Sequence, residues 1–231
     1  MSPCAGCHAG CCRAFAVPLT GADILRIERE LVWTFWDFVC RWEDLDGAIA
    51  GNLAPHFHFA DEPETPFAIC LLHTASRNFP GTTKCRFLME EPPSREHPLG
   101  TAQCGIYSVR PGGCRAFPTR LHSSGLMAVL HEVPERGRLA EPEDAYVLCP
   151  RAWEPADVDP IAAPQELVVL HYEMQFFAQV AQVWNRAPGE WEDFPEFLRL
   201  VYANRVQAAE PGSATVEFKP ADSAKPQMRA A

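Results

Sequence analysis

Four cysteines lie within nine residues near the start of the sequence, in the run CAGCHAGCC, at positions Cys4, Cys7, Cys11 and Cys12. The C-x-x-C spacing of Cys4 and Cys7 lets two thiolates reach one metal ion, while the turn between them directs backbone N–H groups at the sulfurs. Neighbouring side chains diverge, so we interpret Cys11 and Cys12 as ligands of different centres or of different irons. The run therefore predicts a metal site.

Four further cysteines are widely spaced and extend the candidate ligand set to eight thiols: Cys85, Cys104, Cys114 and Cys149. Eight thiolates suit two tetrathiolate sites, or one four-iron four-sulfur cluster with a second site. The predicted cofactor is thus an iron–sulfur cluster, with the four-iron four-sulfur type favoured, or zinc. Cys40 and Cys70 lie in apolar segments, and we interpret both as core residues because unmodified cysteine is among the most buried residue types.

Three side chains in the segment CGIYSVRPGGCR are candidates for contact with the cofactor: Tyr107, Arg110 and Arg115. Positive donors close to thiolates offset their charge and hydrogen-bond the sulfurs, which raises the reduction potential of a cluster. The alternative is a surface loop with ordinary salt bridges. A turn at Pro111, Gly112 and Gly113 would carry Cys114 toward Cys104.

The composition indicates one globular domain and argues against several classes of partner. The chain has 231 residues, 47% of them apolar, and a net charge of −10. Nucleic-acid binding needs clustered Lys and Arg, which the sequence lacks. We expect no membrane span, since no stretch approaches about 18 apolar residues, and without an export signal we expect a cytoplasmic protein. Ten cysteines in the cytosol more often bind metal than form disulfides.

The apolar periodicity predicts an α+β, mainly helical fold with an irregular cysteine-rich metal-bound centre and a small β-hairpin. A capping box at Thr20 and Asp23 marks the first helix. The remaining Pro-, Gly- and Cys-rich stretch at 80–118 is expected to have little regular structure unless metal ties it down. The predicted elements are helices at 21–43, 165–186 and 191–206, a loop at 44–66, a strand or short helix at 67–72, and a hairpin of 125–133 with 145–149. Residues 1–207 are predicted to form one domain and 208–231 a disordered tail.

These residues resemble the bacterial cysteine-cluster family of the YkgJ type, a zinc- or iron-chelating domain. Its pattern is similar to CAGCHAGCC followed by CRFL, CGIYSVRPGGCRAF and a last cysteine, so the resemblance covers residues 4–149. It implies that the eight cysteines named above are the metal-binding set, while Cys40 and Cys70 match nothing in the pattern. This chain has three residues between Cys7 and Cys11, where the family is often written with two.

Three functions fit this pattern. The first is an iron–sulfur protein that handles electrons or supports a modification reaction; the others are a zinc-stabilised protein-interaction module and a metal carrier. Whether the chain is an enzyme stays open, because no acid/base pair or nucleophile triad is recognisable in the sequence. A protein partner of unidentified kind also stays open.

Overall fold

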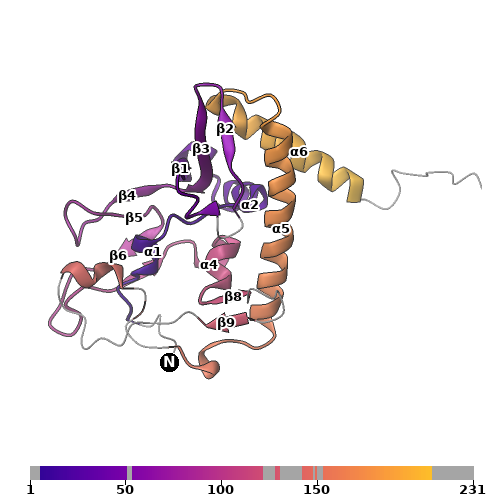
Figure 1. Ribbon diagram of the computed structural model, residues 1–231. Coiled ribbons are helices and arrows are strands. Elements are labelled where there is room, and N and C mark those ends of the chain that lie inside the picture. Colours follow the sequence, from indigo (N-terminus) through magenta and orange to yellow (C-terminus); the bar gives the residue numbers. More distant parts are fainter. Residues whose placement is uncertain are drawn as a thin grey trace, which may run out of the picture.

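The computed structural model describes residues 6–50, 54–121, 128–130, 142–147, 149 and 153–209. Short elements dominate the chain as far as residue 157, and two long helices, α5 and α6, complete it (Figure 1). The helices are α1 Cys11–Ala14, α2 Gly21–Leu31, α3 Phe35–Phe38, α4 Gly112–Ala116, α5 Ala162–Trp184 and α6 Phe194–Ala209, with 3-10 turns at Tyr107–Val109, Pro142–Tyr146, Pro155–Asp157 and Trp191–Asp193. The strands are β1 Val39–Glu43, β2 Phe57–Phe59, β3 Glu62–Leu71, β4 His73–Ala75, β5 Thr83–Cys85, β6 Leu88–Glu90, β7 Ala102–Cys104, β8 Thr119–Leu121 and β9 Ala128–Leu130.

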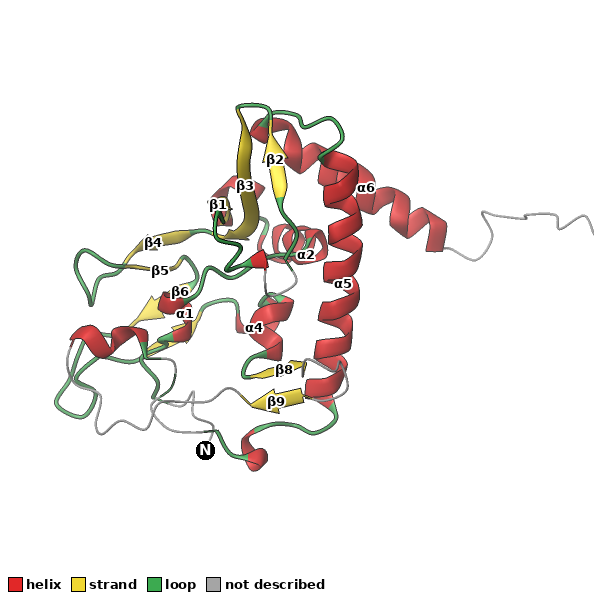
Figure 2. Ribbon diagram, in the orientation of Figure 1, coloured by secondary structure: helices red, strands yellow, loops and turns green. Residues whose placement is uncertain are grey.

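The prediction of a mainly helical fold with an irregular centre is wrong. The described strands form four separate antiparallel sheets, ordered β1-β3-β2, β4-β5, β6-β7 and β8-β9. The stretch 80–118 contains regular elements, β5, β6, β7 and α4, which turns and loops connect. Short strands escape a search for periodicity, since three residues are too few to show an alternation. Figure 2 shows these strands distributed beside the helices rather than gathered in one sheet.

The predicted helix at 21–43 is three elements instead. Helix α2 begins at the predicted capping box, in which Asp23 N donates to Thr20 Oγ1 over 3.1 Å, and it ends at Leu31. Val32 follows in the left-handed region with φ 56°, a conformation that costs a residue with a Cβ about 1–2 kcal/mol. A second capping box at Thr34 then starts α3, and the chain continues as β1. In the sequence the helical periodicity continues past this boundary. The segment nevertheless forms β1, because its conformation is set by pairing with β3, a contact distant in sequence.

Three other expectations can be compared with the structure. The segment 67–72 proves to be mostly strand, within β3, and Cys70 lies directly opposite Cys40 on β1. Cys70 is buried as predicted and Cys40 is partly buried. The predicted hairpin is wrong, since β9 pairs with β8, while Pro142–Tyr146 forms a 3-10 helix. The predicted loop at 44–66 contains β2 and the start of β3, whereas the predicted tail beyond residue 209 lies outside the described residues.

Aromatic side chains join the two C-terminal helices to the first sheet. The Phe57 ring of β2 lies 5.0 Å from Phe177 of α5 and 5.0 Å from Phe194 of α6, measured between ring centroids. Phe59 lies 5.7 Å from Trp184, which itself contacts Phe194 at 5.1 Å. Burial of such rings is the main favourable contribution to folding. Among the described residues, no helix is both long and apolar enough to cross a membrane.

A buried ion pair connects α1 to the small sheets. Arg13 Nη2 lies 2.7 Å from Glu90 Oε1, and both side chains are only 1% exposed. Ser76 contacts both partners, accepting from Arg13 Nη1 over 3.0 Å and donating to Glu90 Oε1 over 2.6 Å. Lys84 Nζ lies 3.6 Å from the other Glu90 oxygen, and the Arg13 guanidinium covers the ring of Phe79. Charges buried this deeply are tolerated only when they are paired and hydrogen-bonded.

Removing the negative charge in Glu90→Gln should lower the free energy of unfolding by about 3–5 kcal/mol, because it leaves the Arg13 charge buried without its partner. Urea unfolding measures this loss. The matched control is Glu62→Gln, which removes a carboxylate that is also paired with an arginine, Arg41, but is 49% exposed. That variant should lose less than about 1 kcal/mol. Equal losses in the two variants would contradict the importance of the buried pair.

The same ion pair should make the free energy of unfolding depend on pH in the acidic range. Burial alone would raise the pKa of Glu90, but hydrogen bonds from Ser76, the Arg77 amide and Arg13 lower it from 4.5 to about 2. A lowered carboxyl pKa contributes stability that is complete above the unfolded value and is lost as pH falls through the folded value. The stability difference between wild type and Glu90→Gln should therefore shrink as pH falls from 4.5 toward 2, and unfolding titrations at several pH values measure it. A difference that does not change with pH would contradict this assignment.

Candidate metal centre

Five of the predicted metal ligands come together from four short elements. Cys11 and Cys12 open α1, Cys85 ends β5, Cys104 ends β7, and Cys114 lies in the middle of α4. The two hairpins place their cysteines next to one another in the fold, since β5 leads directly into β6 and β6 pairs with β7. All five are reduced thiols. A sequence span of more than a hundred residues is thus folded into one thiol group, Cys11, Cys12, Cys85, Cys104 and Cys114.

The charges of these thiols act on one another. Burial raises the pKa of Cys114 well above its ordinary value, and the neighbouring Cys85, Cys11 and Cys104 raise it further. Burial likewise raises the pKa of Cys85 to about 11, with added effects from Cys104 and Cys11. Like charges that perturb each other must be close in space. Neighbouring thiols that are buried or partly buried, and that resist ionisation alone, form a site whose thiolate charge a bound cation would neutralise.

The two adjacent cysteines at the start of α1 have pKa values shifted in opposite directions. The Sγ atoms of Cys11 and Cys12 are 4.0 Å apart. Either sulfur could be the donor, and their contact lowers the pKa of Cys11 and raises that of Cys12. Cys11 is therefore the thiol of this pair that ionises first. The neighbours that act on Cys12 also include Cys85 and Cys114, so both members of the pair belong to the thiol group.

Backbone N–H groups are directed at several sulfurs. The amide of Phe87 hydrogen-bonds the Cys85 thiol and that of Ile106 hydrogen-bonds the Cys104 thiol, and each interaction lowers the pKa of its cysteine against the larger effect of burial. In both cases the donor lies two residues after the cysteine. Such donors stabilise a thiolate and, in metal sites, tune the bound centre.

Of the three predicted cofactor-contacting side chains, Arg110 lies nearest the thiols. Its charge lowers the pKa of Cys11, Cys104 and Cys114 against larger effects, and its guanidinium lies 4.0 Å above the ring of exposed Tyr107. Arg115 is directed elsewhere, because its Nε donates to Glu166 Oε2 of α5 over 2.7 Å. Arg110 therefore supplies positive charge to three of these thiols, and Lys84 supplies it to Cys85.

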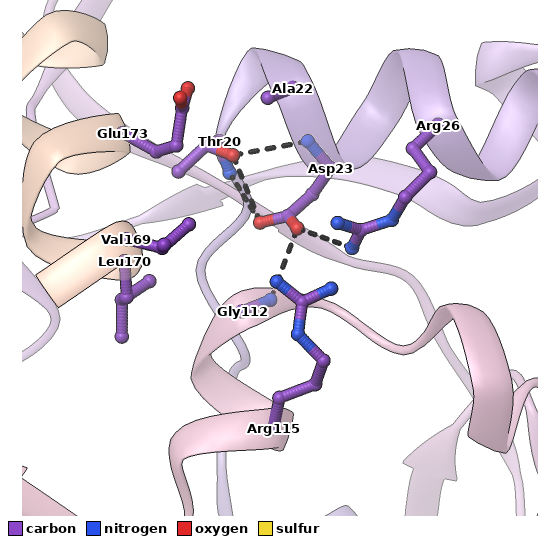
Figure 3. A pocket seen from close by; sticks show the side chains of 9 residues that line it. All are labelled: Thr20, Ala22, Asp23, Arg26, Gly112, Arg115, Val169, Leu170 and Glu173. Carbon is purple, nitrogen blue, oxygen red and sulfur yellow. Dashed lines mark hydrogen bonds and ion pairs between the residues drawn. The ribbon is translucent and has the colours of Figure 1, made fainter. Parts of the chain in front are cut away.

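Asp23 anchors the helix that carries Cys114. Its Oδ1 accepts from the backbone N–H of Gly112, the first residue of α4, over 3.1 Å, and from Arg26 over 2.7 Å. Its Oδ2 accepts from the amide and the hydroxyl of Thr20. Figure 3 shows these contacts converging on one carboxylate, in a small pocket between α2, α4 and α5. One capping residue therefore fixes the start of two helices.

Of the remaining predicted ligands, Cys7 and Cys149 also accept hydrogen bonds. Cys7 Sγ accepts from the amide of Ala9 over 3.2 Å, which repeats the donor arrangement of Cys85 and Cys104. Cys149 is buried and its Sγ accepts from Trp153 Nε1 over 3.1 Å. Cys4 lies outside the described residues. Within the described part of the chain, no three Cys, His, Asp or Glu side chains are arranged to hold a metal ion. The donors fit a thiophilic metal, and binding would require their sulfur atoms to move closer together.

A comparison with protein families matches the segment that carries most of these cysteines. Residues 3–135 match the CxxCxxCC family, described as "Putative zinc- or iron-chelating domain". The chain belongs to the CxxCxxCC family. The match includes the whole thiol group and Arg110, so chelation of zinc or iron is the property that this CxxCxxCC domain shares with its family. No curated protein and no solved structure matches the chain.

Sequence reasoning missed the residues that position the CxxCxxCC thiols. The capping box at Asp23 was visible in the sequence, but nothing local indicated that the same carboxylate holds α4. Glu90 and Ser76 gave no signal, since their role depends on Arg13, which is distant in sequence. Positioning residues of this kind become recognisable only once the elements are packed.

Asp23→Asn should reduce stability by about 1–3 kcal/mol, because it removes the charge from a buried acceptor of four hydrogen bonds. Chemical unfolding followed by tryptophan fluorescence measures it. Asp37→Asn is the control, since Asp37 makes the same two bonds to Thr34 but is exposed and caps α3 alone. The loss should be smaller in the control. A loss as large in Asp37→Asn would show that capping, and not the contact with Gly112, is what Asp23 contributes.

Proposed function

We propose that this protein holds a four-iron four-sulfur cluster through Cys11, Cys85, Cys104 and Cys114, with Cys12 beside it, and that it serves in electron transfer. The observation that carries the proposal is the thiol group itself, together with the amide donors on Cys85 and Cys104. A cluster bound there would accept and release one electron at a time.

The separate origin of the four thiols supports a cluster. A structural zinc ion usually takes pairs of ligands from a C-x2-4-C turn, and no two of the four proposed ligands have this spacing to one another. A four-iron cluster offers one iron at each of four corners, which suits four thiolates held by four different elements.

Arg110 supports a redox role for the site. Its positive charge acts on three of the four proposed ligands, and positive charge near a cluster favours the reduced form. Tyr107 covers the guanidinium on its outer side. Arg115 adds support at a distance, because it holds α4 against α5 through Glu166.

Zinc is the second candidate, because the same donors suit a tetrathiolate zinc ion. The family description includes both metals. A zinc ion would join α1, α4 and the hairpins without redox chemistry, and the chain would then act as a protein-interaction module.

Metal analysis of protein purified without oxygen tests the proposal, with iron, sulfide and zinc counted per chain and an absorption spectrum recorded. We expect brown protein with equal amounts of iron and sulfide. Cys104→Ser and Cys114→Ser should each reduce the iron content by at least about tenfold, because each removes a thiolate ligand. Cys40→Ser is the matched control and should keep the wild-type content, since Cys40 lies on β1 outside the thiol group.

Colourless protein with stoichiometric zinc would replace the cluster by the zinc alternative. Wild-type metal content in both Cys104→Ser and Cys114→Ser would refute the ligand assignment altogether.

A further inference from the structure

We infer that the pocket between α2, α4 and α5, here called the arginine pocket because Arg26 and Arg115 line it, binds a short organic monocarboxylate. The pocket has a volume of about 140 Å³. A cavity of about 150 Å³ holds one benzene molecule, so the arginine pocket has room for a ligand of about six non-hydrogen atoms. Butyrate has that size. Such a ligand would bind whichever metal the thiol group holds.

The two arginines have hydrogen-bond donors that no group in the described part of the chain uses. Arg26 donates from Nη2 to Asp23 Oδ1 over 2.7 Å and to the Arg110 carbonyl over 3.1 Å, but its Nε is buried without a partner. Arg115 donates from Nε to Glu166 Oε2 over 2.7 Å, and among the described residues its two Nη groups have no acceptor. Donors without acceptors are uncommon inside native proteins, and they indicate a place for a ligand or for water.

The carboxylates that line the arginine pocket are already used as acceptors. Asp23 accepts four hydrogen bonds, and both oxygens of Glu173 accept from Arg205, over 2.7 and 2.8 Å. The pocket therefore offers a ligand donors rather than acceptors. A ligand that supplies acceptor oxygens and a negative charge complements it, because the planar guanidinium group pairs with carboxylate and phosphate through two parallel hydrogen bonds.

Two features favour a monocarboxylate over phosphate. The negative charges of Asp23 and Glu173 lie at the same pocket, and they repel a dianion more strongly than a monoanion. Val169 and Leu170 give the pocket an apolar side, which a hydrocarbon chain can cover and phosphate cannot. Figure 3 shows these two side chains on one side of the Asp23 carboxylate and the Arg26 guanidinium on the other. The head and the tail of a small organic acid therefore have separate places.

Calorimetric titration of the full chain, as purified, with butyrate tests the inference. We expect saturable binding with a dissociation constant below about 10 mM. Butanol, which lacks the charge, and inorganic phosphate should each bind at least about tenfold more weakly than butyrate. Arg26→Lys keeps the positive charge but loses the planar fork, so it should weaken butyrate binding by about tenfold.

Val169→Asp is the second variant, and it should weaken butyrate binding at least about tenfold because it places a negative charge in the pocket. Val168→Asp is the matched control. Val168 precedes Val169 on α5 and is similarly exposed, 52% against 49%, but it does not line the pocket. Since water screens its charge, this variant should keep the wild-type affinity within about twofold.

Three results would refute the carboxylate site. The first is the absence of saturable butyrate binding to the wild-type chain, which would leave the pocket to water. The second is phosphate binding as tight as that of butyrate. The third is an equal affinity for butyrate in Val168→Asp and Val169→Asp, which would place the ligand elsewhere on the molecule.

Discussion

The positions of the cysteines in the thiol group depend on the buried ion pair between Arg13 and Glu90. Arg13 follows Cys12 directly on α1, and Glu90 ends β6, whose partner strand carries Cys104. Lys84, the residue before Cys85, approaches the same carboxylate. The charges that hold these segments are therefore adjacent in sequence to the cysteines that the segments carry. Because a buried ion pair tolerates little displacement, it fixes α1 relative to both hairpins.

A second carboxylate, that of Asp23, fixes the position of α4. Asp23 is bonded to Gly112 and, through Arg26, to the carbonyl of Arg110. The Arg110 side chain then faces the thiols from a backbone that is held on both sides. The proposed cluster would thus be surrounded by segments whose positions are set by fixed charges and not by the metal alone. This differs from a small zinc domain, in which the metal supplies most of the folding energy.

The sequence predicted what depends on local pattern or on donor chemistry. Thr20 and Asp23 located the start of α2, and the apolar spacing located α5 and α6 closely. The cysteine spacing led to the correct family and hence to zinc or iron. The sequence could not show that the expected long helix is followed by strand β1 or that β9 pairs with β8, since both depend on partners distant in sequence. The sequence also could not predict which of the eight thiols lie together, because the spacing of cysteines does not determine which hairpins become neighbours.

The elements that carry the thiol group are only three to five residues long. Helices and hairpins of this size have almost no stability of their own, whereas the C-terminal part of α5 is packed into the aromatic core. Segments with few contacts open and close while the rest of a domain stays folded, a motion that amide hydrogen exchange detects. The thiol group can therefore be exposed by a local opening at the edge of the core, to which Cys85 belongs. A cofactor could then be inserted after synthesis, into a chain that has already folded.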